Sequence, residues 1–313
     1  NIRFKDGFRF GGKTSNLKLF KEEIMNRKKI YPLYLALIPA VVFFIFFIVP
    51  STVGYYYAFT NWSAARTTNL KFVGFDNIMS ILSSTKVPVA FVNTLIYAGV
   101  KTVTVTLLGF VFAYILNREI KTRTALRTVY FIPSIFSCLV VGLIFSAVFQ
   151  TRHGTINNIL NLMGIANIQW LGQRGTAVFA ICVAEVWRNV GYAIIITLAG
   201  LQSVSSDYLE AGKLDGASEW QLFRHITLPL IMPTVNVNIL FSLIYGLKMF
   251  DLIYVMTGGG PGNATESFGT LMMNEMSAGR YAQSVAVNLV FTVLLVIVSV
   301  VYQKFSSRWE TVL

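Results

Sequence analysis

Six apolar segments, each long enough to cross a lipid bilayer, constrain this chain of 313 residues more than any other feature. A helix needs about 20 apolar residues to cross the hydrocarbon layer. The segments are 32–59, 88–117, 124–149, 176–201, 233–257 and 282–304. Each is too long and too uniformly apolar for a barrel strand, which shows about ten residues of alternating character. With 55% apolar residues and a mean hydropathy of +0.61, the sequence predicts an all-α polytopic membrane protein with six transmembrane helices.

The distribution of lysine and arginine predicts how these helices are oriented. One alternate set of stretches carries 17 of these residues: nine in 1–31, four in 118–127, two in 202–232 and two in the C-terminal tail. The other set carries six: three in 60–87, two in 150–175 and one in 258–281. Cytoplasmic loops are enriched in basic residues, so both termini are expected in the cytoplasm. The net charge of +12 then reflects this bias, and without an aromatic and basic groove it does not indicate a nucleic acid partner.

Residues 1–31 are predicted to form a basic cytoplasmic arm, followed by one transmembrane domain over 32–313. Within the arm, Gly7 to Thr14 matches the P-loop pattern, but a phosphate-binding loop must join a buried strand to a helix, and no soluble α/β domain follows. Leu17, Phe20 and Ile24 share one helical face, which predicts a short amphipathic helix at the inner membrane surface.

Enzymatic chemistry has little support in the sequence. Cys138 and Cys182 lie inside apolar segments, where cysteine packs as a small apolar residue. The histidines are expected in loops, and neither H-E-x-x-H nor G-x-S-x-G occurs. We therefore expect no catalytic residue, no metal site and no cofactor in this chain.

A polar island from Glu210 to Pro233 interrupts the apolar sequence and falls in a cytoplasmic loop by the predicted topology. Asp207 is expected to cap a helix over 208–222, with Glu210 at its third position as in a capping box. Asp215 precedes a glycine, where the chain is expected to turn. Small residues would let another protein approach this helix closely; they are Ala211, Gly212, Gly216 and Ala217.

The island resembles the EAA signature of permease subunits of ABC importers. It reads EAGKLDGA, followed by Phe223, Ile226, Leu228, Pro229 and Pro233. Only Gly212 departs from the family pattern, where a second alanine stands. Further matches resemble the maltose-type carbohydrate branch: PSTVGYYYAFTNW from Pro50, FVGFDN from Phe72, Asn93-Thr94-Leu95, and FDLIYVMTGGGPGNATE from Phe250. The resemblance covers residues 30–310.

This resemblance implies a type I ABC importer permease fold in the bacterial inner membrane. The partners it implies are a second permease, usually a different chain, two cytoplasmic subunits that bind Mg-ATP, and an external sugar-binding protein. Residues 207–233 would carry the coupling helix through which the ATPases act. Glu210 would pair with a basic ATPase residue, and Asp215 and Gly216 would shape the loop at the helix end.

Polar residues inside the apolar segments are candidates for the substrate path, because they are costly in lipid. One stripe at helical spacing contains Glu185, Arg188, Asn189 and Tyr192. A second set is Asn236, Asn238, Ser242, Tyr245, Lys248 and Asp251. Glu185 with Arg188, and Lys248 with Asp251, are expected to form ion pairs three residues apart.

The resemblance also implies which of these positions contact a sugar. They are Gly191, Tyr192, Ser242, Tyr245, Gly246 and Met249. Gly246 and Met249 replace amide-type residues of the family, so a sugar other than maltose is expected. Helix packing is the alternative role for each position.

Residues 257–270 are expected to touch the external binding protein, or to be a flexible connector, and 150–175 to contain a lateral helix. An ion-coupled secondary transporter or channel, using Asp251 or Glu185, would share the apolar composition, but it leaves the polar island unexplained.

Overall fold

The computed structural model describes residues 33–118 and 121–310, and over these residues the chain is helical with only two isolated β-bridges. The predicted N-terminal arm, with its amphipathic helix and its P-loop-like sequence, lies outside the described residues. The chain divides into two compact units between Gly54 and Tyr55, and each is described by itself.

The first unit contributes one apolar helix. It consists of α2 (Leu33–Phe43), the π-helical turn η1 (Phe44–Ile48) and the start of α3 (Val49–Tyr57). The 23 residues from Leu35 to Tyr57 are long and apolar enough to cross a membrane. Because large apolar side chains are exposed all round this helix, it is suited to a lipid environment.

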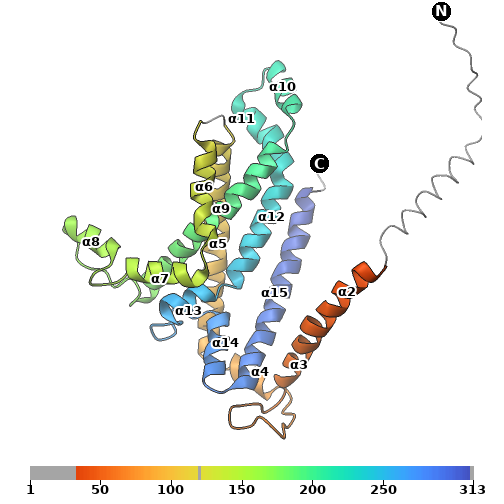
Figure 1. Ribbon diagram of the computed structural model, residues 1–313, viewed down its shortest axis with the longest axis vertical. Coiled ribbons are helices and arrows are strands. Elements are labelled where there is room, and N and C mark those ends of the chain that lie inside the picture. The colour runs from red at the N-terminus through yellow and green to blue at the C-terminus, as the bar shows by residue number, and fades with distance from the viewer. Residues whose placement is uncertain (1–32, 119–120, 311–313) are drawn as a thin grey trace, which may run out of the picture. The chain divides into compact units, whose positions relative to one another are not determined.

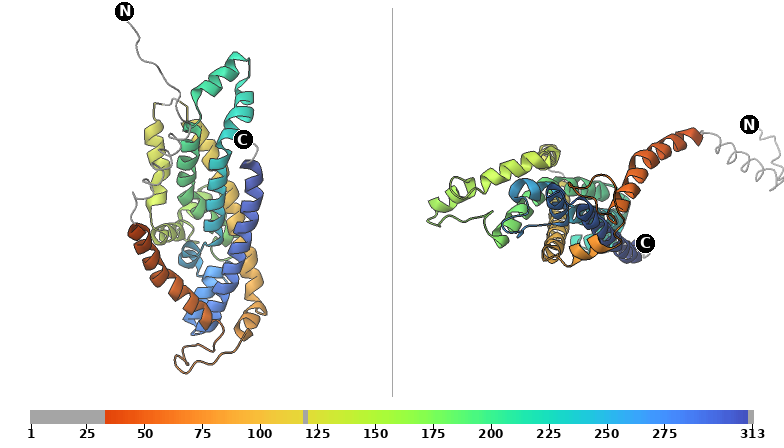
Figure 2. Two further views of the ribbon diagram at one scale, coloured as in Figure 1. Left: turned by 90° about the vertical axis from the view of Figure 1, so that its right-hand side faces the viewer. Right: turned by 90° about the horizontal axis from the view of Figure 1, so that it is seen from below.

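Three long helices of the second unit pack directly against one another: α5 (Lys86–Leu116), α9 (Arg174–Gln202) and α12 (Leu228–Leu247). The C-terminal helix α15 (Tyr281–Glu310) packs beside α12, and Figures 1 and 2 show the four running lengthwise together. Glycines permit the close approach, as in many membrane bundles.

The third predicted segment, 124–149, is not a straight crossing. It folds as α6 (Arg123–Ile135) and α7 (Cys138–Val148), which are bent by 97°. The backbone is extended at Phe136 and Ser137, and the Ser137 hydroxyl accepts a bond from the Val140 amide, capping α7. The described residues therefore contain five helices fit to span a membrane, or six if this bent pair forms one crossing.

The fifth predicted segment, 233–257, is wrong at both ends. Helix α11 (Glu219–Leu222), the π-helical turn η2 (Phe223–Thr227) and α12 run on from 219 to 247. The helix then breaks, and α13 (Asp251–Thr257) is separate. A π-turn at the start and a break at residues 248–250, which contain neither glycine nor proline, have no signal in the apolar pattern.

Shorter helices lie toward the ends of the bundle. Helices α4 (Asp76–Leu82) and α14 (Phe268–Ser277) lie at one end, and α10 (Ser206–Leu214) with α11 lies at the other (Figure 1). The loops that the charge count places outside and inside are separated in the same way. The lateral helix predicted within 150–175 is α8 (Thr155–Leu162).

The loop between α13 and α14 is held by side chains of α5. Asn93, fully buried, donates its amide to the carbonyls of Ala264 and Glu266, both at 2.9 Å. Tyr97 donates its hydroxyl to the Thr265 carbonyl at 3.1 Å. Because buried carbonyls need partners, these bonds fix the loop against the long helix.

Candidate functional site

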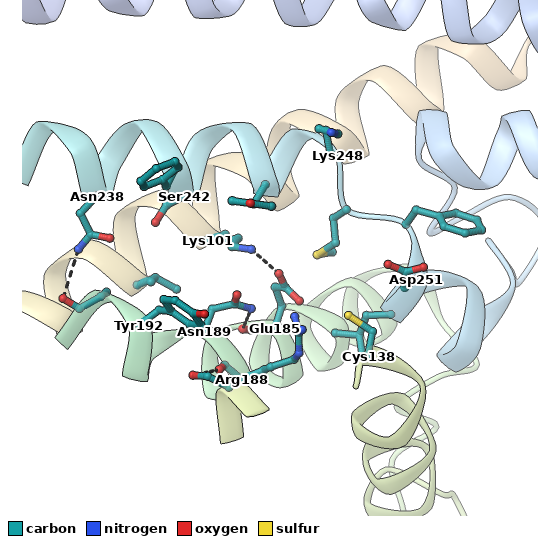
Figure 3. A pocket seen from close by; sticks show the side chains of 18 of the residues that line it. Lys101, Cys138, Glu185, Arg188, Asn189, Tyr192, Asn238, Ser242, Lys248 and Asp251 are labelled. Carbon is teal, nitrogen blue, oxygen red and sulfur yellow. Dashed lines mark hydrogen bonds and ion pairs between the residues drawn. The ribbon is translucent and has the colours of Figure 1, made fainter. Parts of the chain in front are cut away.

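A cavity of about 590 Å³ lies among the helices of the second unit. Figure 3 shows its side chains converging from α5, α9 and α12, with α6, α7 and α13 closing its sides. Its polar and charged lining residues are Lys101, Ser134, Glu185, Arg188, Asn189, Tyr192, Asn238, Ser242, Tyr245, Lys248 and Asp251. Polar groups in a cavity between apolar helices are candidates for contact with a solute, because such groups are unfavourable in lipid.

Two tyrosines give the cavity aromatic surfaces. Tyr192 on α9 is 56% exposed and Tyr245 on α12 is 61% exposed, although both lie in long helices that pack together. Phe131 supports the Tyr192 ring at a centroid distance of 5.6 Å. Exposed aromatic rings beside amides and hydroxyls can stack on the C–H faces of a sugar while its hydroxyl groups are hydrogen-bonded.

Four of the six positions expected to contact a sugar line the cavity: Tyr192, Ser242, Tyr245 and Met249. The two glycines pack against other helices instead. A Cβ at Gly191 would lie 2.2 Å from the Tyr130 carbonyl oxygen, and one at Gly246 would lie 2.7 Å from the Ala98 Cα. Their small size therefore brings α6 to α9 and α5 to α12.

The expected ion pairs of the cavity are wrong. Glu185 accepts from the Lys101 ammonium of α5 at 2.5 Å, both residues being 5% exposed. Arg188 instead donates its Nε to the Phe136 carbonyl at 3.2 Å, at the bend between α6 and α7. Lys101 is the residue that sequence reasoning left unassigned, although a lysine inside an apolar segment was the available signal.

Lys248 and Asp251 also do not pair. Lys248 is the C-cap residue that follows α12, and Asp251 is the first residue of α13. The break between them removes the helical spacing on which the expectation rested. Over the described part of the chain, neither side chain has an ion-pair partner within 4.0 Å.

The polar island forms two short helices around a turn, so the single helix expected over 208–222 is wrong. Ser205, not Asp207, caps α10, its hydroxyl accepting from the Asp207 amide at 3.2 Å. Helix α10 ends at Leu214, and Gly216 has φ +81°, the left-handed backbone that glycine adopts without strain. Ser218 and Gln221 then form a capping box that starts α11.

The island exposes much of its surface at one end of the bundle. Glu210, Ala211, Asp215 and Gly216 are exposed and Ala217 is half-buried. Gly212 faces inward, since a Cβ there would lie 2.5 Å from Leu222 Cδ2.

Large apolar side chains that sequence reasoning missed share the surface of the island: Tyr208, Leu214 and Trp220 are 59%, 89% and 64% exposed. Apolar patches rimmed by polar residues are typical of protein contact surfaces, so these three side chains are candidates for contact with another protein.

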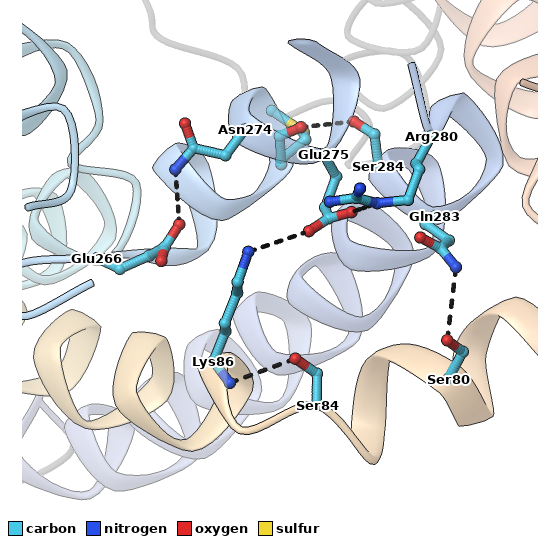
Figure 4. A network of polar contacts seen from close by, with 10 residues as sticks. Ser80, Ser84, Lys86, Glu266, Asn274, Glu275, Arg280, Gln283 and Ser284 are labelled. Carbon is cyan, nitrogen blue, oxygen red and sulfur yellow. Dashed lines mark hydrogen bonds and ion pairs between the residues drawn. The ribbon is translucent and has the colours of Figure 1, made fainter. Parts of the chain in front are cut away.

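A network of charges lies at the opposite end, between α5, α14 and α15 (Figure 4). Lys86 Nζ lies 3.6 Å from Glu275 Oε1, and the Arg280 guanidinium donates to the same carboxylate. The bond from Arg280 holds the pKa of Glu275 below its usual value. Burial raises the pKa of Glu266, whose Oε1 accepts from the Asn274 amide at 2.8 Å while its buried Oε2 has no partner.

Metal-binding geometry does not occur among the residues that the structure describes: no group of three or more His, Cys, Asp or Glu is placed to hold an ion. Cys138 and Cys182 are free thiols.

Comparison with known proteins assigns a family to this arrangement. The family model described as "Binding-protein-dependent transport system inner membrane component" matches residues 105–311. The trehalose/maltose transport system permease protein MalF of Thermococcus litoralis is 33% identical over 271 residues, covering 87% of this chain and 92% of that protein. The multiple sugar-binding transport system permease protein MsmF of Streptococcus mutans is 34% identical, covering 88% and 94%.

A solved structure shares the fold. A chain of a bacterial ABC transporter involved in the import of the acidic polysaccharide alginate superimposes with a TM-score of 0.78, at 23% sequence identity, covering 93% of this chain and 99% of that chain. A bacterial alginate ABC transporter in complex with an alginate pentasaccharide-bound periplasmic protein also gives a TM-score of 0.78, at 23% sequence identity, covering 91% of this chain and 97% of that chain.

Proposed function

Since the chain belongs to the family of inner membrane components of binding-protein-dependent transport systems, we propose that it is the permease subunit of an ATP-driven sugar importer. Both relatives are named as sugar transport permeases, and the match covers 92% and 94% of their lengths. The observation that carries the proposal is the combination, in one chain, of a polar cavity between the spanning helices and an exposed EAA-type helix at one end of the bundle.

The importer would work by alternating access in the cytoplasmic membrane of a bacterial cell. An external binding protein would deliver the sugar, and this chain and a second permease would enclose it. Two cytoplasmic subunits would bind and hydrolyse Mg-ATP, because energy has to enter through partners if this chain carries no ATP site of its own. A ligand moves a conformational equilibrium only by binding one state more tightly, so the ATPases must hold the permease differently with and without ATP.

The coupling contact would be made by the outward surface of α10. Glu210 is exposed there, one turn before the fully projecting Leu214. An acid and an apolar anchor on one helical face suit a basic pocket with an apolar floor on an ATPase. Asp215 and Gly216 would set where the helix ends, because Gly216 requires a left-handed backbone.

Transport by the assembled complex in proteoliposomes tests the proposal. The reconstituted system contains this chain, its second permease, the ATPases and the sugar-loaded binding protein. Uptake of labelled oligosaccharide is expected to require ATP on the cytoplasmic side and to be unaffected by proton and sodium gradients. Uptake driven by a gradient without ATP would favour the ion-coupled alternative and contradict the proposal.

Glu210→Ala tests the coupling surface directly. We expect sugar uptake per ATP hydrolysed to fall about tenfold, because a desolvated charge contact across an interface is lost. Asp207→Ala is the matched control, an exposed acid one turn earlier in the same helix, and should leave the ratio unchanged. Equal uptake ratios in Glu210→Ala and wild type would remove Glu210 from the coupling contact.

A further inference from the structure

The buried ion pair between Lys101 and Glu185 lies in the wall of the cavity. Neither residue belongs to the signature sequence or to the six positions expected to contact a sugar. Lys101 comes from α5 and Glu185 from α9, and the two groups meet beside the open space (Figure 3). Both are 5% exposed, so the pair is desolvated by the surrounding helices.

Stability alone gives a weak reason for such a pair. Removing two charges from water offsets much of their attraction, and apolar side chains of similar volume often stabilise a buried position as well or better. The pair also lies within the apolar part of the bundle, where ionisable groups are retained for function far more often than for packing.

The hydrogen-bonding capacity of the pair is only partly used. An ammonium carries three N–H donors, and Lys101 gives one to Glu185 Oε1. Over the described residues, no hydrogen bond reaches Glu185 Oε2, and the neighbouring Asn189 amide donates to the Glu185 backbone carbonyl. Two donors and one acceptor are thus left at the edge of the cavity.

An aromatic face lies next to these unused groups. Lys101 Nζ lies 5.8 Å from the centroid of the Tyr245 ring, and Tyr245, which is 61% exposed, lines the cavity. These donors, the acceptor and the aromatic surface lie close together and match the chemistry of a pyranose ring. Its adjacent hydroxyls can accept from the ammonium and donate to the carboxylate, while its C–H face stacks on the tyrosine.

We propose that Lys101 and Glu185 form a binding pair for adjacent hydroxyl groups of a neutral pyranose unit, held against Tyr245. This inference rests on the proposed sugar-import function and names the substrate class of its cavity. The two charges neutralise each other, so the pair itself selects hydroxyl groups and does not call for a charged sugar.

Uptake by the complete complex, with its binding protein, tests the proposal on three probes: maltotriose, raffinose and trigalacturonate. The wild type is expected to take up a neutral probe. Uptake of trigalacturonate alone would overturn the neutral class while leaving the import function intact. Failure to import any probe with ATP present would count against the proposed function, and the inference would fall with it.

The neutral probe then measures the pair in the double variant Lys101→Met with Glu185→Leu, which leaves no unpaired charge. We expect kcat/KM for uptake to fall at least about tenfold in complexes that assemble, since hydrogen bonds to charged groups are lost. Thr102→Val is the matched control, because Thr102 is next to Lys101 in the sequence, its buried hydroxyl has no hydrogen-bond partner, and it does not line the cavity.

Uptake by the apolar pair within about twofold of wild type, as for a neutral surface substitution, would show a purely structural role and overturn the proposal. If that variant does not assemble, the exchanged pair Lys101→Glu with Glu185→Lys decides. It keeps the ion pair but reverses donor and acceptor, so a binding role predicts the same loss and a structural role predicts none.

Discussion

Glu266 is an unusual residue for the outer end of the bundle, because its carboxyl group is fully buried and half of its hydrogen-bonding capacity is unused. Its backbone carbonyl accepts from Asn93, so the residue is fixed in place by α5. The nearest charges are Lys86, which pairs with Glu275, and Glu275 itself. A group in such a position is most stable when it is neutral.

Replacing Glu266 by glutamine should therefore change how stability depends on pH. Burial raises the folded-state pKa of Glu266 above its unfolded value of about 4.3, so the folded state binds the proton more tightly. Wild-type stability therefore falls as pH rises from the unfolded pKa through the folded-state pKa. We expect Glu266→Gln to be more heat-stable than wild type at pH 8 and equal to it at pH 4, measured by thermal unfolding of the detergent-solubilised chain.

Glu275→Gln is the control of opposite sign. The bond from Arg280 lowers the pKa of Glu275, so its contribution is present above the unfolded pKa and is lost as pH falls through the folded one. This variant should be less stable than wild type at pH 8. A glutamine at position 266 that destabilises the chain at pH 8 would contradict the raised pKa of Glu266.

Residue identity alone predicted part of the cavity. The tyrosines and Ser242 line it, and polar residues in apolar segments were the signal. The sequence could not show that Glu185 pairs with Lys101, because residues 84 positions apart meet only through the packing of α5 on α9. Spacing within one helix favoured Arg188 as the ion-pair partner of Glu185, but Arg188 donates to the Phe136 carbonyl at the bend after Ile135.

Helix contacts in this bundle depend on glycines at the points of closest approach. Gly246 lies against Ala98 of α5, and Gly191 lies against Tyr130 of α6. Both were expected as sugar contacts from family resemblance. Their positions in the structure give them a packing role that the sequence could not distinguish, since a small residue beside a pocket and a small residue between helices have the same pattern.

Gly246→Ala should force α5 and α12 apart. The added Cβ would lie 2.7 Å from the Ala98 backbone, and overpacking of this kind costs about 1–3 kcal/mol. We expect a lower unfolding temperature and weaker assembly with the partner subunits. Gly99→Ala is the matched control in α5, where an added Cβ meets nothing within 4 Å; equal stability of the two variants would contradict the close contact.

Element boundaries followed the apolar pattern where helices are straight. Helices α5 and α9 lie within a few residues of their predicted ranges. The bend between α6 and α7 was missed because the sequence around it is mostly apolar. The break after α12 was missed because Lys248 and Asp251 were expected to form an ion pair on a continuous helix. These two irregular points lie at the cavity, where Cys138 and Asp251 contribute to its lining.

The two ends of the bundle carry different structural features. One end carries α10 and α11, with exposed charges and apolar side chains. The other carries the loop that Asn93 and Tyr97 fix to α5. Helix α5 runs from that loop to the Lys101–Glu185 pair and on toward the opposite end, so one rigid element connects the outer loop to the cavity.

Site-specific photocrosslinking tests most directly whether a separate ATPase binds the α10 surface. A photoreactive phenylalanine analogue replaces Leu214, which is 89% exposed, in cells that express the whole importer; the same analogue at Met276, 51% exposed on α14, is the control at the other end. We predict that position 214 crosslinks to a cytoplasmic ATP-binding subunit and position 276 does not. Crosslinks from position 214 to the external binding protein, or none to an ATPase, would contradict the account.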